Sequence, residues 1–332
     1  MPFLGRKSGS AETDASIQSL LVGNGLEWGD DEYRSSNSLA RPDGFGLPAS
    51  LGKEQQRRLC GSAECTSGWT LPWRNRRRPT FEGQWGCSGR CVLSMVRTAL
   101  RRELGDGIAS APPPHRHRVP LGLLMLAQGW ITHPQLQRAL AAQRESGAGR
   151  IGDWLMSECG LEAEQITRGL GMQWGCPVLT TEQFSPEAMA LVMPRVLIES
   201  FGLLPLRVAG STILYLGFAD RLDASAAFAT EQMTDLKVES GVVQGSHFDA
   251  AQSRLLACDG VEMKLEAAED KDAMAGRITA ILEQKQPIAS RLVRLHQYYW
   301  LRIWLESGAI GRVGKLPAMG EDVLDYVFSI RA

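Results

Sequence analysis

The sequence has no uninterrupted apolar run that approaches the roughly 20 residues needed by a membrane-spanning helix. Its first residues, MPFLGRKSGSAETD, lack the apolar core of a secretory signal peptide. We therefore expect a soluble cytoplasmic protein that reaches any membrane only through a partner. A formal net charge of −1 also excludes the overall basic character of a bulk nucleic-acid-binding chain.

Motifs of several common enzyme classes are missing as well. The segment Gly311–Leu316 contains Gly and Lys, but it lacks the spacing and the hydroxyl residue of a phosphate-binding loop. The chain has no G-x-S-x-G nucleophile elbow and no H-E-x-x-H metal motif. Its histidines are scattered without a partner in sequence: His115, His117, His133, His247 and His296. We expect no enzymatic activity.

Four of the seven cysteines form two close pairs, Cys60-x4-Cys65 and Cys87-x3-Cys91. Two pairs on separate turns can surround one ion with four thiolates, which is the ligand set of structural zinc sites. The spacings differ from the two residues usual in zinc ribbons, and disulfides are the alternative that a reducing cytoplasm disfavours. The segment is too small and polar to build a core unaided, so we expect structural Zn²⁺. We expect Cys159, Cys176 and Cys258 to be ordinary buried thiols.

Aromatic and basic residues alternate between the two cysteine pairs. They could stack on bases and contact phosphates, which would make the segment a nucleic-acid site. We favour the alternative, in which the tryptophans cover the metal site and the arginines form a solvated face or bind an acidic partner. The residues are Trp69, Trp73, Arg74, Arg76, Arg77, Arg78, Phe81 and Trp85.

From residue 120 the chain repeats itself at an offset of 30 residues. Residues 120–143 (PLGLLMLAQGWITHPQLQRALAAQ) align without a gap on residues 150–173 (RIGDWLMSECGLEAEQITRGLGMQ). Helical spacing predicts a short helix, a turn and a longer helix in each copy, the longer helices beginning after Thr132 and at Glu162. Such a duplication predicts two similar pieces packed side by side with a two-part ligand site. The identical positions are Gly122/Gly152, Gln135/Gln165, Arg138/Arg168, Leu140/Leu170 and Gln143/Gln173.

These motifs resemble the N-terminal domain of type II secretion and type IV pilus assembly ATPases, the GspE_N or MshEN family. Its signature is two copies of R-L-G-x-x-L-x-x-x-G-x-I-x-x-x-x-L-x-x-x-L-x-x-Q joined by a short spacer, here Arg144–Gly149. The segment Gln173–Pro177 looks like the family's exit from the second copy. Later segments look like its helix-then-strand passage and its closing strands and helix: Phe184–Arg207, Thr212–Asp220, Leu236–Ser240 and Phe248–Leu256. The motor domain of those ATPases is not found in this sequence.

Family members with intact motifs bind cyclic di-GMP. A guanidinium can fork onto a guanine edge or a phosphate, a glycine allows close approach, and a glutamine amide both donates and accepts. The contacts that the resemblance implies are Arg118, Leu121, Gly122, Met125, Gly129, Ile131, Leu136, Leu140, Gln143, Arg150, Ile151, Gly152, Leu155, Leu161, Ile166, Leu170 and Gln173.

The motifs depart from the family pattern at two positions. Pro120 stands where the first copy should have its leading arginine, for which Arg118 is the candidate substitute. Cys159 stands at a motif glycine, which is displaced to Gly160. Loss of one bidentate ionic contact corresponds to on the order of 1.5–3 kcal/mol. Many family members with eroded motifs bind no nucleotide and act as docking domains. Two helical hairpins packed as a core explain the leucines equally well.

We therefore predict an α+β protein with a two-motif helical subdomain and a small α/β sheet subdomain. The predicted order is a disordered segment (1–55), a four-cysteine zinc-ribbon-like module (56–106), a Pro-rich linker (107–116), the GspE_N/MshEN-like domain (117–258) and a helical tail (259–332). The tail is predicted to contain helices over Glu262–Gln284 and Pro287–Ser307 and another from Glu321.

The predicted function is that of a non-enzymatic adaptor or sensor that binds cyclic di-GMP and/or a secretion or pilus assembly component. One alternative is a ligand-free docking module of such a system. Another is a zinc-dependent nucleic-acid-binding regulator.

Overall fold

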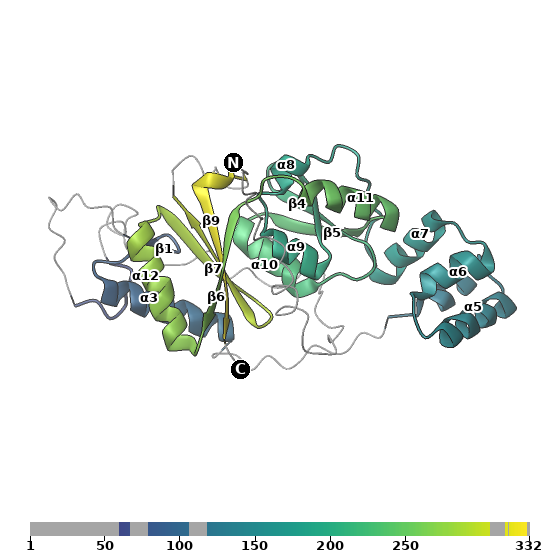
Figure 1. Cartoon of the computed structure of the whole chain (residues 1–332), viewed down its shortest axis with the longest axis horizontal. Coiled ribbons are helices and arrows are strands. Elements are labelled where there is room, and N and C mark those ends of the chain that lie inside the picture. Colours follow the sequence, from purple (N-terminus) through teal and green to yellow (C-terminus); the bar gives the residue numbers. More distant parts are fainter. Residues whose placement is uncertain (1–59, 67–78, 106–117, 306–315, 318, 331–332) are drawn as a thin grey trace, which may run out of the picture.

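The computed structural model describes residues 60–66, 79–105, 118–305, 316–317 and 319–330. Figure 1 shows a helical unit at one end, a central sheet with helices, and a second sheet at the other end. The segments predicted to be disordered (1–55) and a Pro-rich linker (107–116) lie outside the described residues. Each helix in the described part of the chain is too short or too polar to cross a membrane.

The helical unit contains both copies of the repeat. The first copy forms α4 (Leu121–Ala127) and α5 (His133–Ser146), and the second forms α6 (Ile151–Cys159) and α7 (Ala163–Trp174). The predicted pattern of a short helix, a turn and a longer helix is confirmed.

The longer helix begins in the same way in both copies. The backbone N–H of Thr132 donates to Oε1 of Gln135 at 2.8 Å, and the N–H of Glu162 donates to Oε1 of Gln165 at 2.9 Å. The two identical glutamines are therefore capping residues at the third helical position, as the sequence predicted.

The central unit is a three-stranded sheet in the order β3-β4-β5, with β3 antiparallel and β5 parallel to β4. The strands are β3 (Leu204–Ala209), β4 (Ile213–Phe218) and β5 (Lys237–Val242). The predicted strands near Thr212–Asp220 and Leu236–Ser240 and the helix over Phe248–Leu256 are confirmed. Four helices accompany the sheet: α8 (Pro186–Met189), α9 (Arg195–Phe201), α10 (Ala224–Thr234) and α11 (Gly245–Leu256).

The prediction of a helical tail is wrong for most of that segment. The described residues between 262 and 330 form a four-stranded sheet in the order β6-β9-β8-β7, with the helix α12 (Lys271–Lys285) between β6 and β7. The predicted first helix is a strand followed by α12, the second is a hairpin, and the last is a 3-10 turn followed by a strand. The elements are β6 (Glu262–Ala268), β7 (Ala289–Leu295), β8 (Tyr298–Trp304), η1 (Gly320–Asp322) and β9 (Val323–Ile330).

The β7–β8 hairpin was mistaken for a helix because it is buried on both faces. Leu292, Tyr299 and Leu301 belong to one core, whereas Val293 and Trp300 belong to another. A strand covered on both faces loses the alternation of apolar and polar residues that marks a half-exposed strand. Its apolar positions then also fit helical spacing.

One face of this sheet is covered by a helix from the cysteine segment. The helix α3 (Gly89–Leu104) packs on α12 and β7, and its Val92 and Met95 share a core with Ile278 and Phe328. The other face of the sheet packs on the central unit. Helix α3 and the four-stranded sheet therefore share one core, although residues 118–258 separate them in sequence.

A buried ion pair joins the sheet to the central unit. Arg302 on β8 is 2% exposed and donates to both carboxylate oxygens of Asp325 at 2.8 and 2.7 Å. The same guanidinium donates to the backbone oxygens of Leu191 and Val192 at 3.1 and 2.9 Å. Trp300 Nε1 also donates to Asp325, so the buried carboxylate and guanidinium are well supplied with partners.

Candidate functional sites

The two copies of the repeat close on each other. Helix α4 packs against α7 and α5 against α6, so each short helix lies on the long helix of the other copy. Gln173 Nε2 donates to the backbone oxygen of Val119 at 2.9 Å, and Gln143 Nε2 donates to that of Gly149 at 3.1 Å. Val119 and Gly149 are the equivalent positions directly before the two copies. The final glutamine of each copy thus holds the start of the other, which confirms the predicted side-by-side packing.

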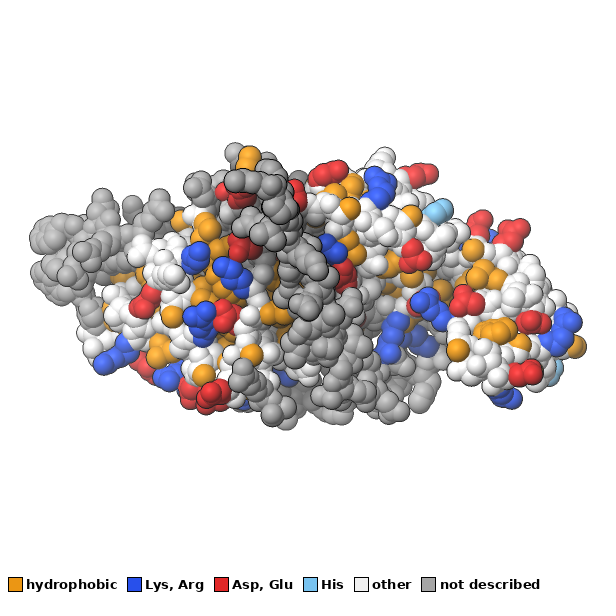
Figure 2. Space-filling view, in the orientation of Figure 1, with side chains coloured by type: hydrophobic (Ala, Val, Ile, Leu, Met, Phe, Trp, Pro, Cys, Tyr) orange, Lys and Arg blue, Asp and Glu red, His pale blue; other side chains and the backbone are white. Residues whose placement is uncertain are grey.

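The arginines at the starts of both copies reach the same place. The guanidinium carbon of Arg118 lies 3.4 Å from the ring centroid of Trp174. Arg150 forms an ion pair with Asp220, whose backbone oxygen accepts a hydrogen bond from Trp174 Nε1 at 2.9 Å. We call these four residues together with Gln173 the arginine edge. Figure 2 shows Lys and Arg side chains gathered where the helical unit meets the rest of the molecule.

Sequence reasoning proposed Arg118, Arg150 and Gln173 but missed two members of this edge. Trp174 follows the last motif residue directly, and Asp220 follows β4 at the carboxyl end of a parallel strand pair. Polar residues at such strand ends are frequent ligand contacts in α/β sheets, and this signal could have identified Asp220.

Most of the apolar motif residues form a core between the copies. Gly122 is buried, and a Cβ at this position would lie 2.6 Å from Cδ1 of Leu136. Gly152 is also buried, and a Cβ there would lie 3.1 Å from Cγ2 of Ile166. Both glycines therefore allow close packing of helices. The other buried candidate contacts are Leu121, Met125, Ile131, Leu136, Leu155, Leu161 and Ile166.

The remaining candidate contacts are accessible to a ligand at least in part. Those that are half-buried are Arg118, Leu140, Gln143, Ile151, Leu170 and Gln173, and those that are exposed are Gly129 and Arg150. A surface ligand can touch these residues without moving the core.

The displaced glycine of the second copy keeps its backbone role. Gly129 in the first copy and Gly160 in the second have φ values of 69° and 70°, the left-handed region that favours glycine. Helix α6 ends at Cys159 and Gly160 is its C-cap. The departure at Cys159 therefore lengthens the helix without removing the turn.

The four paired cysteines come together. Their Sγ atoms all lie within 4.8 Å of one another, and the Cys65–Cys87 and Cys87–Cys91 Sγ distances are both 3.5 Å. Four thiolates bound to zinc at about 2.3 Å place their sulfurs about 3.8 Å apart in a tetrahedron, which is close to this arrangement. The cluster is a candidate metal site, and its all-sulfur ligand set suits zinc. The predicted convergence of the cysteines is confirmed.

Local structure explains how the cysteines meet. Cys60 precedes Gly61, whose N–H donates to the backbone oxygen of Trp85 in β2 (Gln84–Trp85) at 2.9 Å. Cys91 lies in the first turn of α3, where its N–H donates to the side chain of the N-cap residue Ser88 at 3.3 Å. The turn over residues 60–66, which is bonded to β2, therefore supplies Cys60 and Cys65, and the start of α3 supplies Cys87 and Cys91.

The electrostatics of the cluster favour a cation. Burial together with neighbouring thiols raises the pKa of Cys87 to about 12, and burial raises the pKa of Cys60. A hydrogen bond to Ser88 lowers the pKa of Cys91 to about 7. Thiolates this close repel one another unless a positive ion lies between them. The described cysteines are all free of disulfide bonds.

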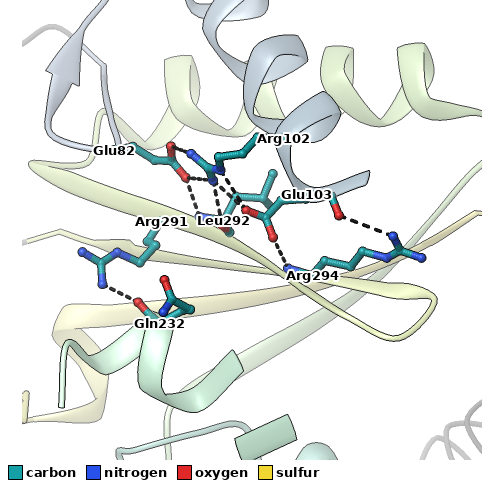
Figure 3. Close-up of polar contacts among 7 residues, drawn as sticks. All are labelled: Glu82, Arg102, Glu103, Gln232, Arg291, Leu292 and Arg294. Carbon is teal, nitrogen blue, oxygen red and sulfur yellow. Dashed lines mark hydrogen bonds and ion pairs between the residues drawn. The ribbon is translucent and has the colours of Figure 1, made fainter. Parts of the chain in front are cut away.

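A polar network ties the β1–β2 hairpin (residues 80–85), which lies between the two cysteine pairs and is called the cysteine hairpin below, to the edge strand β7 (Figure 3). Glu82 lies between β1 (Thr80–Phe81) and β2, and its carboxylate accepts from Arg102 of α3 at 2.7 and 2.8 Å. Glu103 accepts from the backbone N–H of Arg294 at 2.9 Å. The N–H of Glu82 donates to the backbone oxygen of Ser290 at 3.0 Å, which covers part of the free edge of β7.

The other predicted features fall partly outside the described residues. Of the alternating aromatic and basic residues, Phe81 is buried in the core beneath α3 and Trp85 is half-buried, and the others are not described. The cysteines Cys159, Cys176 and Cys258 are half-buried and lie apart from the cluster.

Among known proteins, this chain has similarity to solved structures. No protein-family model matches the chain, and no curated protein matches it. A structure of MshE with cdg (cyclic di-GMP) is 26% identical with a TM-score of 0.35, and the match covers 42% of this chain and 99% of that one. The N-terminal domain of XpsE, in two crystal forms, is 21% identical with TM-scores of 0.31 and 0.25. These matches cover 42% of this chain and 98% and 99% of theirs. Because the TM-scores are below 0.5, the resemblance of the helical unit rests on its motifs and its geometry.

Proposed function

We propose that the chain is a non-enzymatic adaptor and sensor of a secretion or pilus type of assembly, and that it binds cyclic di-GMP at the arginine edge. The observation that supports this function is the meeting of Arg118 and Arg150 at Trp174 and Asp220. The starts of two related copies there offer two guanidinium groups to one ligand. A cyclic dinucleotide carries two phosphates and two bases, and it suits such a doubled site.

Each exposed group of the edge has a role in this proposal. The guanidinium of Arg150 binds a phosphate or the edge of a guanine, and Arg118 supplies the charge that Pro120 cannot. The ring of Trp174 offers a face for base stacking once Arg118 turns to the ligand. The buried leucines and glycines keep the two copies in register, and the half-buried Leu140, Ile151 and Leu170 offer apolar contacts to the ligand.

Calorimetric titration of cyclic di-GMP into the full chain tests the proposal. We expect binding by the wild type and a tenfold to hundredfold loss in Arg150→Ala, about 1.5–3 kcal/mol for a charged contact. Arg101→Ala is the matched control, because Arg101 is an exposed arginine on α3. No heat from the wild type overturns the ligand proposal.

The second candidate is a docking module that needs no nucleotide. The burial of Gly122 and Gly152 favours it, because both glycines already have a packing role in the fold. This candidate predicts that a secretion or pilus assembly component is retained in a pull-down by Arg150→Ala and Gln173→Ala alike. Loss of the partner in both variants would instead tie docking to the arginine edge.

A further inference from the structure

Asp220 forms an ion pair with Arg150, the motif arginine that would bind a ligand. It lies in the connection between β4 and α10, and its carboxylate pairs with Arg150. Its backbone oxygen is held by Trp174 Nε1 at 2.9 Å. The side chains of Arg150 and Asp220 are 68% and 41% exposed, so the pair is open to exchange with an anion from solvent.

We propose that Asp220 is an internal competitor, which holds Arg150 in the unliganded protein and is displaced by the phosphate of the ligand. This inference rests on the proposed function of the arginine edge. A carboxylate and a phosphate both accept the fork of hydrogen bonds that a guanidinium donates. An exposed ion pair contributes little free energy. It can orient the Arg150 side chain, and an incoming phosphate can still replace it.

Displacement of Asp220 acts on the start of α10. Three residues later Asp223 is the N-cap of α10, and its carboxylate accepts from the N–H of Ala226 at 2.7 Å. The same carboxylate lies 2.9 Å from Nε2 of His296, in the turn between β7 and β8. The ring of His296 stacks on Phe201 with the centroids 5.4 Å apart. A short chain of contacts through Asp223 and His296 therefore joins the arginine edge to the four-stranded sheet.

The far end of α10 is tied to the same sheet. Its C-cap residue Asp235 pairs with Arg291 of β7 at 2.8 Å, and Arg291 also donates to the backbone oxygen of Gln232. Both ends of α10 thus contact the β7–β8 hairpin. Replacement of Asp220 by the ligand at Arg150 would loosen the contact between Asp223 and His296, while the contact between Asp235 and Arg291 holds. We therefore expect ligand binding to change the β7–β8 turn.

Titration of cyclic di-GMP into three full-length proteins tests this inference. We expect Asp220→Asn to bind about 1.5- to fivefold tighter than the wild type, because the ligand no longer displaces an exposed ion pair. Asp249→Asn is the control, since it removes the same charge from an exposed position on α11 and should leave affinity unchanged. Hydrogen exchange should show that the ligand speeds exchange at residues 224–226 and 296–298 in the wild type.

The outcomes separate this inference from the function on which it rests. Equal affinities for the wild type and Asp220→Asn overturn the competitor role and leave the ligand site standing. No heat from either protein overturns both. Equal tightening in Asp249→Asn shows a general charge effect and overturns the competitor role. If Asp220→Asn melts at a lower temperature than the wild type, Asp220→Ser takes its place under the same criteria.

Discussion

Removal of metal from the cysteine cluster is expected to destabilise the four-stranded sheet at the other end of the sequence. The cluster holds the first turn of α3, where Cys91 lies, and α3 then buries Val92, Met95 and Leu100 against α12 and the sheet. Loss of a bound metal would free the start of α3 from the turn that carries Cys60 and Cys65. The helix, and with it part of the core of the sheet, then becomes less stable.

The size of the effect follows from linkage. A metal at 100 times its Kd stabilises the folded form by about 2.7 kcal/mol. One kcal/mol shifts the Tm of a domain of 60–100 residues by about 4–8 °C, so metal removal should lower the Tm by roughly 10–20 °C. If α3 detaches from the sheet, the loss of stability exceeds about 2.7 kcal/mol, because each large apolar side chain that α3 buries contributes about 1.5–3 kcal/mol.

Thermal melting of the full chain in reducing buffer measures this effect. Metal content is determined by atomic emission before and after chelation, and unfolding is followed by tryptophan fluorescence, since Trp300 is fully buried at the sheet. Cys60→Ser should reproduce the chelator, whereas Cys258→Ser removes a thiol outside the cluster and should not. Metal-free protein whose Tm does not rise on addition of Zn²⁺ would refute the reasoning, as would equal melting of the two serine variants.

Three further substitutions, with Gly276→Ala as a control, test the packing that positions the sites. Arg302→Met leaves a buried carboxylate without its main partner and should cost about 3–5 kcal/mol of unfolding free energy in urea. Gly122→Val presses on Leu136 and should cost about 1–3 kcal/mol, whereas Gly276→Ala, which has open space around it, should be neutral or stabilising by up to about 1 kcal/mol. Gln173→Ala removes the bond to the start of the first copy and should cost about 0.5–1.5 kcal/mol in the same assay. A value near zero for Arg302→Met would show that the buried pair contributes nothing net, and equal effects of the two glycine variants would contradict the close packing at Gly122.

The helical unit was predictable because the duplication doubled each local signal. Thr132 followed by Gln135 is a helix start in itself, and its repetition at Glu162 and Gln165 confirmed the reading at a second place. Capping and helical spacing act within a few residues, so the sequence expresses them directly. The same holds for the cysteine pairs, whose ligand chemistry requires two turns to meet.

The C-terminal sheet was not predictable in the same way, because its determinants are distant in sequence. Trp300 is buried by the central unit, and Leu301 is buried beneath α3 and α12. The elements that bury these two residues are distant in sequence, so the sequence of β8 shows only a uniformly apolar segment. The ion pair of Arg302 with Asp325 likewise depends on register between β8 and β9. Asp220 shows the same limit at the candidate site, since its partner Arg150 comes from a different unit.

The strand β7 connects the two candidate sites. Its backbone oxygen at Ser290 accepts from Glu82 of the cysteine hairpin, and the side chain of the next residue, Arg291, binds the end of α10. The strand ends in a turn where His296 meets the N-cap of α10. A metal that fixes the hairpin therefore acts on the same strand that α10 contacts at both ends. Together the two proposals predict that a metal at the cysteine cluster steadies the strand that α10 contacts, and that ligand exchange at the arginine edge changes that contact.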